Sequence, residues 1–182
     1  MNAPGPSPYK AVPLRHILWY VPLVLTLHNT EEALTMPRWV AEHSSEIMGR
    51  VPFFNAVQFT PRQLLSSLAI ATVVPFVVTL MCAGGEKRSR KLFLLFLLQM
   101  IILLNVFVPH MVATVVMERY NPGAITAVCC NLPFSLYLFL KACKESFLSL
   151  HDLLLLFITA ALAYVPVAAA IHFGGVWIAR NL

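Results

Sequence analysis

Long apolar stretches, separated by short charged or turn-forming segments, constrain this chain more than any other feature. The sequence predicts five of them, at residues 14–35, 62–84, 92–117, 124–142 and 153–178. A helix rises about 1.5 Å per residue, so roughly 20 apolar residues cross the hydrocarbon core of a bilayer. Of the 182 residues, 59% are hydrophobic and 12% are charged, and the charged share is about half that of a soluble domain. These features predict an all-α, polytopic transmembrane helix bundle with about five spans.

Two segments outside the predicted spans have a different character. Residues 1–13 contain four prolines together with a glycine and a serine, which is typical of a disordered tail. Residues 37–51 are polar, but aromatic and apolar side chains recur every four residues, which predicts a short helix at the membrane interface. Residues 31–35 lack the small-x-small pattern of a signal cleavage site, so the first span is expected to stay uncleaved. Residues 14–182 are therefore expected to form a single membrane domain.

The distribution of Lys and Arg predicts the orientation. Eight of the thirteen Lys and Arg residues lie on the N-terminal side of the predicted spans, four of them in the run Lys87–Lys91. Cytoplasmic loops of membrane proteins are enriched in Lys and Arg, so the N-terminus is expected in the cytoplasm and residues 37–61 outside. The basic run has no interleaved aromatic residues of the kind on which nucleic-acid bases stack, so membrane lipids rather than nucleic acid are the expected partners.

Three ionisable side chains interrupt the end of the first apolar stretch within five residues: His28, Glu31 and Glu32. At about 100° per residue, they fall on one arc of a helix. Removing such groups from water is costly unless they find partners, and ionisable groups inside membranes are rare for this reason. The cluster is therefore the first candidate for a functional site.

Further polar residues are expected at a similar depth in other spans. The candidates are His110, Asn131, His172, Gln63, Ser66 and Ser67. The least costly arrangement turns His110 toward the stripe that contains His28 and Glu32, in direct contact or through one ion. Asn105 lies about 140° from His110 on a regular helix and is not expected to share its face. Pro109 can unwind this turn, which leaves Asn105, together with Asn131, as a candidate supporting residue.

Four interpretations of the cluster remain open. Imidazole and carboxylate suit a divalent metal such as zinc, iron or manganese, with His28, Glu32 and His110 as ligands. Without a metal, Glu31 and Glu32 could perform acid–base catalysis on a lipid-like substrate, since adjacent carboxylates repel and one of them retains its proton. Transport or ligand capture with a proton-carrying glutamate is the third interpretation, and polar packing between helices without further function is the fourth. The sequence does not define the substrate, the metal or the oligomeric state.

Four segments resemble a known family of bacterial membrane proteins. In chain order they are His28-x-x-Glu31-Glu32, Met36–Trp39, Asn105-x4-His110 and Tyr120–Ala127. Their order and spacing are similar to those of the HXXEE-motif proteins, from the first predicted span into the fourth. The resemblance implies an integral protein of a bacterial cell membrane, and it implies no particular reaction.

Overall fold

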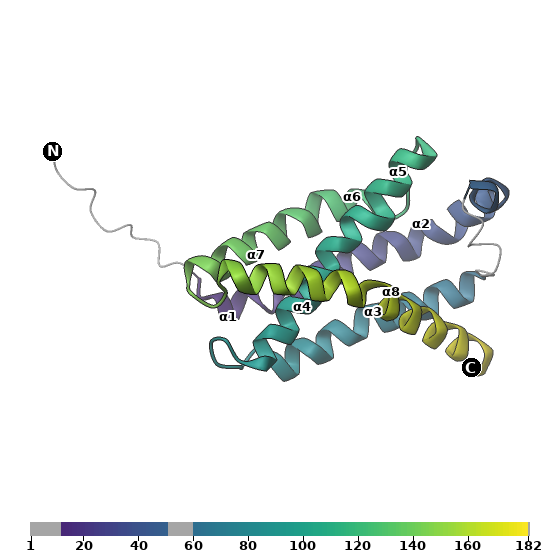
Figure 1. Ribbon diagram of the computed structural model, residues 1–182. Coiled ribbons are helices and arrows are strands. Elements are labelled where there is room, and N and C mark those ends of the chain that lie inside the picture. The colour runs from purple at the N-terminus through teal and green to yellow at the C-terminus, as the bar shows by residue number, and fades with distance from the viewer. Residues whose placement is uncertain (1–11, 51–59, 182) are drawn as a thin grey trace.

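The computed structural model describes residues 12–50 and 60–181, and these residues form helices without any β-strand (Figure 1). The helices are α1 (Leu14–Ile17), α2 (Tyr20–Arg50), α3 (Pro61–Cys82), α4 (Arg90–Asn105), η2 (Val106–Met111), α5 (Val112–Met117), α6 (Ala124–Thr126), η3 (Ala127–Asn131), α7 (Leu132–Lys144) and α8 (Leu150–Asn181). This confirms the predicted all-α fold. Most of the predicted tail lies outside the described residues.

Four helical stretches of the described chain are long and apolar enough to cross a membrane. They are Pro61–Cys82, Arg90–Met117, Ala124–Lys144 and Leu150–Asn181. They coincide with the second to fifth predicted spans, with ends displaced by at most a few residues. The first predicted span falls on α1 and the first half of α2, where the ionisable residues lower the apolar character, and it stays a prediction.

The expected short interfacial helix is not a separate element. Instead, α2 continues through Pro37 to Arg50 as one helix. A proline removes one backbone hydrogen bond, but its fixed φ is close to the helical value, so a long helix can contain it. On the exposed side of this half, Arg38 Nε lies 2.7 Å from Glu42 Oε1, a pair spaced four residues apart as helical neighbours are.

The segments that were predicted to lie on the same side of the membrane as the N-terminus meet at one end of the bundle. Arg15 donates from Nη2 to the carbonyl of Gly85 at 3.2 Å, and Lys87 donates from Nζ to the carbonyl of Glu145 at 2.8 Å. Figure 1 shows α1 and the loops α3–α4 and α7–α8 at this end, while α5 and the end of α2 lie at the other. A core of buried apolar side chains from α1, α2, α4, α7 and α8 fills the bundle between them.

Two segments, η2 and η3, are π-helices, with backbone hydrogen bonds that span five residues rather than four. At the end of η2, for example, the N–H of Val112 donates to the carbonyl of Phe107. Each π-helix lies beside a proline, Pro109 within η2 and Pro133 two residues after η3. Proline has no N–H, so the carbonyl four residues earlier loses its usual donor, and a widened turn accommodates that loss.

Candidate functional site

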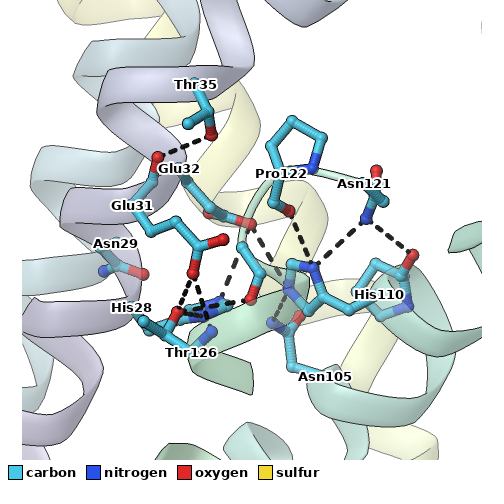
Figure 2. Close-up of polar contacts among 12 residues, drawn as sticks. His28, Asn29, Glu31, Glu32, Thr35, Asn105, His110, Asn121, Pro122 and Thr126 are labelled. Carbon is cyan, nitrogen blue, oxygen red and sulfur yellow. Dashed lines mark hydrogen bonds and ion pairs between the residues drawn. The ribbon is translucent and has the colours of Figure 1, made fainter. Parts of the chain in front are cut away.

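His28, Glu32 and His110 converge between α2 and η2 (Figure 2). Glu32 Oε1 lies 3.4 Å from Nε2 of His110 and 3.8 Å from Nε2 of His28. The two imidazole rings meet edge to face, with centroids 4.7 Å apart. Both histidines are buried, whereas the Glu32 side chain keeps 13% of its surface exposed. The predicted approach of His110 to the stripe on α2 is therefore present.

The spacing of these three residues suits a single ion. One ligand atom from each residue lies within 4.8 Å of the other two, and this is the one group of its kind in the part of the chain that the structure describes. Bonds of about 2.0–2.2 Å to a tetrahedral metal place its ligand atoms roughly 3.4 Å apart. The group could hold a metal after small side-chain adjustments.

The turn between α5 and α6 orients the ring of His110. Nδ1 of His110 lies 3.1 Å from the carbonyl oxygen of Pro122, and the amide nitrogen of Asn121 lies farther from the same atom, at 3.4 Å. A carbonyl oxygen can only accept, so Nδ1 carries the proton and Nε2 stays unprotonated, with the Asn105 amide nitrogen 3.1 Å and Glu32 Oε1 3.4 Å away. Metal-ligating histidines are commonly held in this way, by a backbone carbonyl at the nitrogen that does not bind the metal.

Asn105 does share a face with His110, contrary to the expectation for a regular helix. Its Nδ2 lies 3.1 Å from Nε2 of His110, and its Oδ1 accepts a hydrogen bond of 2.8 Å from the hydroxyl of Tyr164 on α8. The reason is η2, because a π turn brings residues five apart above one another. Asn105 is thus a direct neighbour of the candidate ligand.

Asn131, the other candidate supporting residue, lies at the end of η3 and is buried. Its carbonyl accepts a hydrogen bond from Ser135, and its side-chain amide has no hydrogen-bond partner among the described residues. No contact places it at the three candidate ligands, so its supporting role stays a prediction.

Glu31 points to a different set of partners from Glu32. Its Oε2 accepts hydrogen bonds from the N–H of Thr126 at 2.8 Å and from the hydroxyl of Thr126 at 2.5 Å. Its Oε1 accepts a bond of 2.6 Å from the hydroxyl of Tyr120. Burial, and then this bond to Glu31, raise the pKa of the Tyr120 phenol, which lies outside the candidate spans. Thr126 Oγ1 also lies 3.0 Å from Nδ1 of His28.

Gly123 allows the turn to approach the site closely. Its φ of +82° lies in the left-handed region that favours glycine. A Cβ atom at this position would lie 2.8 Å from both Glu32 Cγ and His110 Cε1, closer than real side chains permit. The turn therefore forms one wall of the candidate site, and only a residue without a side chain fits there.

Two of the other polar residues suggested by depth, Gln63 and Ser67, have local structural roles. Gln63 and Thr60 form a capping box at the start of α3, and Ser67 packs tightly against Gly175 of α8. The ring of His172 lies 5.7 Å from that of Phe173. The sequence did not single out Tyr120, Thr126 or Tyr164 as site residues. Two of these three lie in the Tyr120–Ala127 stretch, which carries part of the family resemblance.

Comparison with known proteins gives one family and one curated relative. Residues 19–138 match the family described as "Protein of unknown function with HXXEE motif". The "Uncharacterized protein YrkK" of Bacillus subtilis (strain 168) is 30% identical over 111 residues, which are 60% of this chain and 63% of that protein. The match thus covers less than two thirds of the relative's length. No solved structure matches. Of the site residues described above, all but Tyr164 fall within the matched family range.

Proposed function

This chain belongs to the HXXEE-motif family, and from that premise we propose that it is a membrane-embedded metalloprotein in which His28, Glu32 and His110 bind one divalent ion. Zinc, iron and manganese are the candidate metals, because imidazole nitrogen together with carboxylate oxygen suits all three. We further propose that the bound ion serves an enzymatic reaction on a lipid-like or small apolar substrate.

The observation that carries this proposal is the spacing of the three side chains. A direct hydrogen bond between imidazole and carboxylate would bring the two atoms to about 2.7–3.0 Å. Here Glu32 Oε1 lies 3.4 Å and 3.8 Å from the two Nε2 atoms, and Nε2 of His28 has no hydrogen-bond partner among the described residues. Both Glu32 distances are long for direct hydrogen bonds, although Nε2 of His110 also lies 3.1 Å from the Asn105 amide nitrogen. The two Glu32 distances are close to the separation of ligands on a common tetrahedral ion.

An enzymatic role is supported by the number of ligands. Three protein ligands leave a fourth position for water or substrate, as in catalytic zinc sites. A divalent ion there would polarise a carbonyl or phosphoryl oxygen and favour the ionisation of a bound water. The Glu32 side chain keeps 13% of its surface exposed, so the cluster is not sealed off from its surroundings. On the helical stretch that carries His110, the exposed residues Phe107, Met111 and Val112 are apolar, which favours a substrate that arrives from the bilayer.

Metal analysis of the detergent-purified protein tests the proposal. We expect bound zinc, iron or manganese in the wild type and its loss in both His28→Ala and Glu32→Gln. His43→Ala is the matched control, because His43 lies on the same helix with its ring against Trp39 and outside the candidate ligand group. Metal retained in both ligand variants, or absent from wild type supplied with each of the three metals, would overturn the proposal. The second of these outcomes would favour a proton-carrying Glu32.

The location is a second part of the proposal: a bacterial cell membrane, with the N-terminus in the cytoplasm and the site nearer the outer surface. The Tyr120 hydroxyl bonds to Glu31, so the site lies at the bundle end opposite the Arg15–Gly85 contact. In a background without native cysteines, an impermeant thiol reagent should label a cysteine at Ser44 in intact cells. Labelling at Ser89 instead would reverse the orientation.

A further inference from the structure

The two adjacent glutamates of the motif have different neighbours, and this difference points to different tasks. Glu32 faces the two imidazoles, whereas Glu31 faces Thr126 and Tyr120. In Figure 2 the Glu31 carboxylate lies directly above Thr126, and Thr126 in turn lies beside His28. Glu31 is therefore placed to act on His28 through Thr126 rather than as a further ligand.

The hydroxyl of Thr126 has one proton and three neighbours that could take it. Its oxygen lies 2.5 Å from Glu31 Oε2, 3.0 Å from Nδ1 of His28 and 3.4 Å from the carbonyl of Gly123. Two oxygens 2.5 Å apart repel unless a proton lies between them. Both oxygens of Glu31 already act as acceptors, from the Tyr120 hydroxyl and the Thr126 N–H. The Thr126 hydroxyl is therefore the donor to Glu31, and its lone pair faces His28.

We infer that Glu31, acting through the Thr126 hydroxyl, holds the proton of His28 on Nδ1 and so presents the Nε2 lone pair toward Glu32. Because the Thr126 hydroxyl donates to Glu31, it can only accept from His28, and Nδ1 must supply that proton. This inference rests on the proposed function for its consequence, metal binding, but the tautomer itself is a property of the metal-free protein. Glu31 is then a positioning residue and not a ligand.

The same turn orients both histidines. The carbonyl of Pro122 holds the proton of His110 on Nδ1 directly, and four residues later Thr126 does so for His28 with the help of Glu31. A threonine hydroxyl can donate or accept, so by itself it would leave the tautomer of His28 undetermined. A carboxylate that takes its proton removes that ambiguity. The need to fix the tautomer of His28 accounts for Glu31, the glutamate of the motif that does not face the imidazoles.

Nitrogen-15 NMR of the full chain tests the tautomer directly, with histidine labelled and the protein purified in detergent with chelator. Nitrogen shifts distinguish a protonated from an unprotonated ring nitrogen, and His28→Ala identifies the His28 signals. In the wild type we expect Nδ1 protonated and Nε2 unprotonated in His28. Thr126→Val keeps the shape but removes the hydroxyl, and it should yield a mixture of tautomers or the Nε2-protonated form. Thr126→Ser, which restores the hydroxyl, should restore the wild-type signals.

Zinc affinity, measured by competition with a chelator, provides the second readout. Loss of such an outer hydrogen-bond partner typically costs about 10–100-fold in metal affinity, which is the loss expected for Thr126→Val. Thr126→Ser should stay within a few-fold of wild type. Should the valine variant fail to fold, Glu31→Ala replaces it, because the freed hydroxyl can then donate to His28 and allow both tautomers.

The outcomes separate this inference from the proposed function. Suppose that His28 is protonated on Nδ1 in the wild type, that Thr126→Val changes this tautomer, and that the wild type binds no metal. This result would overturn the metal proposal and leave the inference standing. A metal-binding wild type whose His28 tautomer is unchanged by Thr126→Val and Glu31→Ala would overturn the inference alone. An Nε2-protonated His28 in the wild type would also overturn it.

Discussion

The two ends of the bundle are built in different ways. At the end that contains α1, regular helices bury apolar side chains such as Leu14, Leu95 and Leu138, all of them fully inaccessible. At the other end the helices are interrupted by η2 and η3, whereas left-handed backbone occurs in the loops of both ends, at Arg88 and Ser146 as well as at Glu118 and Gly123. The buried groups at the end with η2 and η3 include His28 and His110, held by individual hydrogen bonds and close contacts.

The two ends of the bundle are expected to differ in how well they tolerate amino-acid substitutions. Apolar packing requires complementary volumes, which many side chains can supply, and a single change lowers stability without redirecting any group. A buried polar site requires each donor and acceptor at a particular place, so a change of one group leaves others unpaired. We therefore expect substitutions at the first end to affect stability and substitutions at the second to affect ligand binding.

The largest effect is expected from the ligands themselves. Glu32→Ala and His110→Ala should each abolish high-affinity metal binding, and the double variant should be little worse than either, because the three ligands act as one unit. Competition with a chelator measures the affinities. Fully additive losses would assign Glu32 and His110 to unrelated roles.

Gly123→Ala tests whether the turn is part of the site. The new Cβ would lie 2.8 Å from Glu32 Cγ and from His110 Cε1, and the backbone at φ +82° disfavours alanine by about 1–2 kcal/mol. We expect the protein to lose most metal affinity and to unfold several degrees lower in a thermal scan. Gly84→Ala is the matched control, because a Cβ there meets no atom within 4 Å. Equal behaviour of the two variants would contradict a close-fitting turn.

Leu95→Ala tests the apolar end. Leu95 is fully buried, while its neighbour Leu94 is 48% exposed. Creation of a cavity at Leu95 should cost about 2–4 kcal/mol in unfolding free energy, measured by denaturing-detergent titration, with metal affinity unchanged. Leu94→Ala should cost much less. A loss of metal affinity in Leu95→Ala would show that the two ends are coupled.

The smallest effect is a pH dependence from Tyr120. Its phenol pKa is raised by burial and by the bond to Glu31. The pKa of the phenol is therefore higher in the folded than in the unfolded protein, where it is about 10. The neutral phenol stabilises the fold at pH values below the unfolded-state pKa. This contribution is lost as the pH rises through the folded-state pKa. Unfolding measured across this alkaline range should show the loss in wild type but less of it in Tyr120→Phe. Identical profiles would indicate that the Tyr120–Glu31 bond contributes nothing to stability.

Site residues that are energetically costly to bury were easier to predict from the sequence than residues that are not. His28, Glu32 and His110 were found because an ionisable side chain inside an apolar stretch requires a partner. Thr126 and Tyr164 were missed because threonine and tyrosine occur in membrane helices for many reasons and carry no comparable cost. A regular α-helix would turn Asn105 away from His110, but the widened turn at Pro109 brings the two together, which suits the supporting role expected of Asn105.

The sequence by itself determined the helical fold, the approximate ends of the four candidate spans and the ionisable residues that need partners. These properties are local, since they depend on run length, rise per residue and the cost of burying charge. The tertiary structure decided which glutamate faces the imidazoles, which nitrogen of each ring points inward and how closely the turn at Gly123 approaches. Those features depend on helix rotation and on contacts between segments about 100 residues apart, such as Thr126 with Glu31 and His28, which no local pattern encodes.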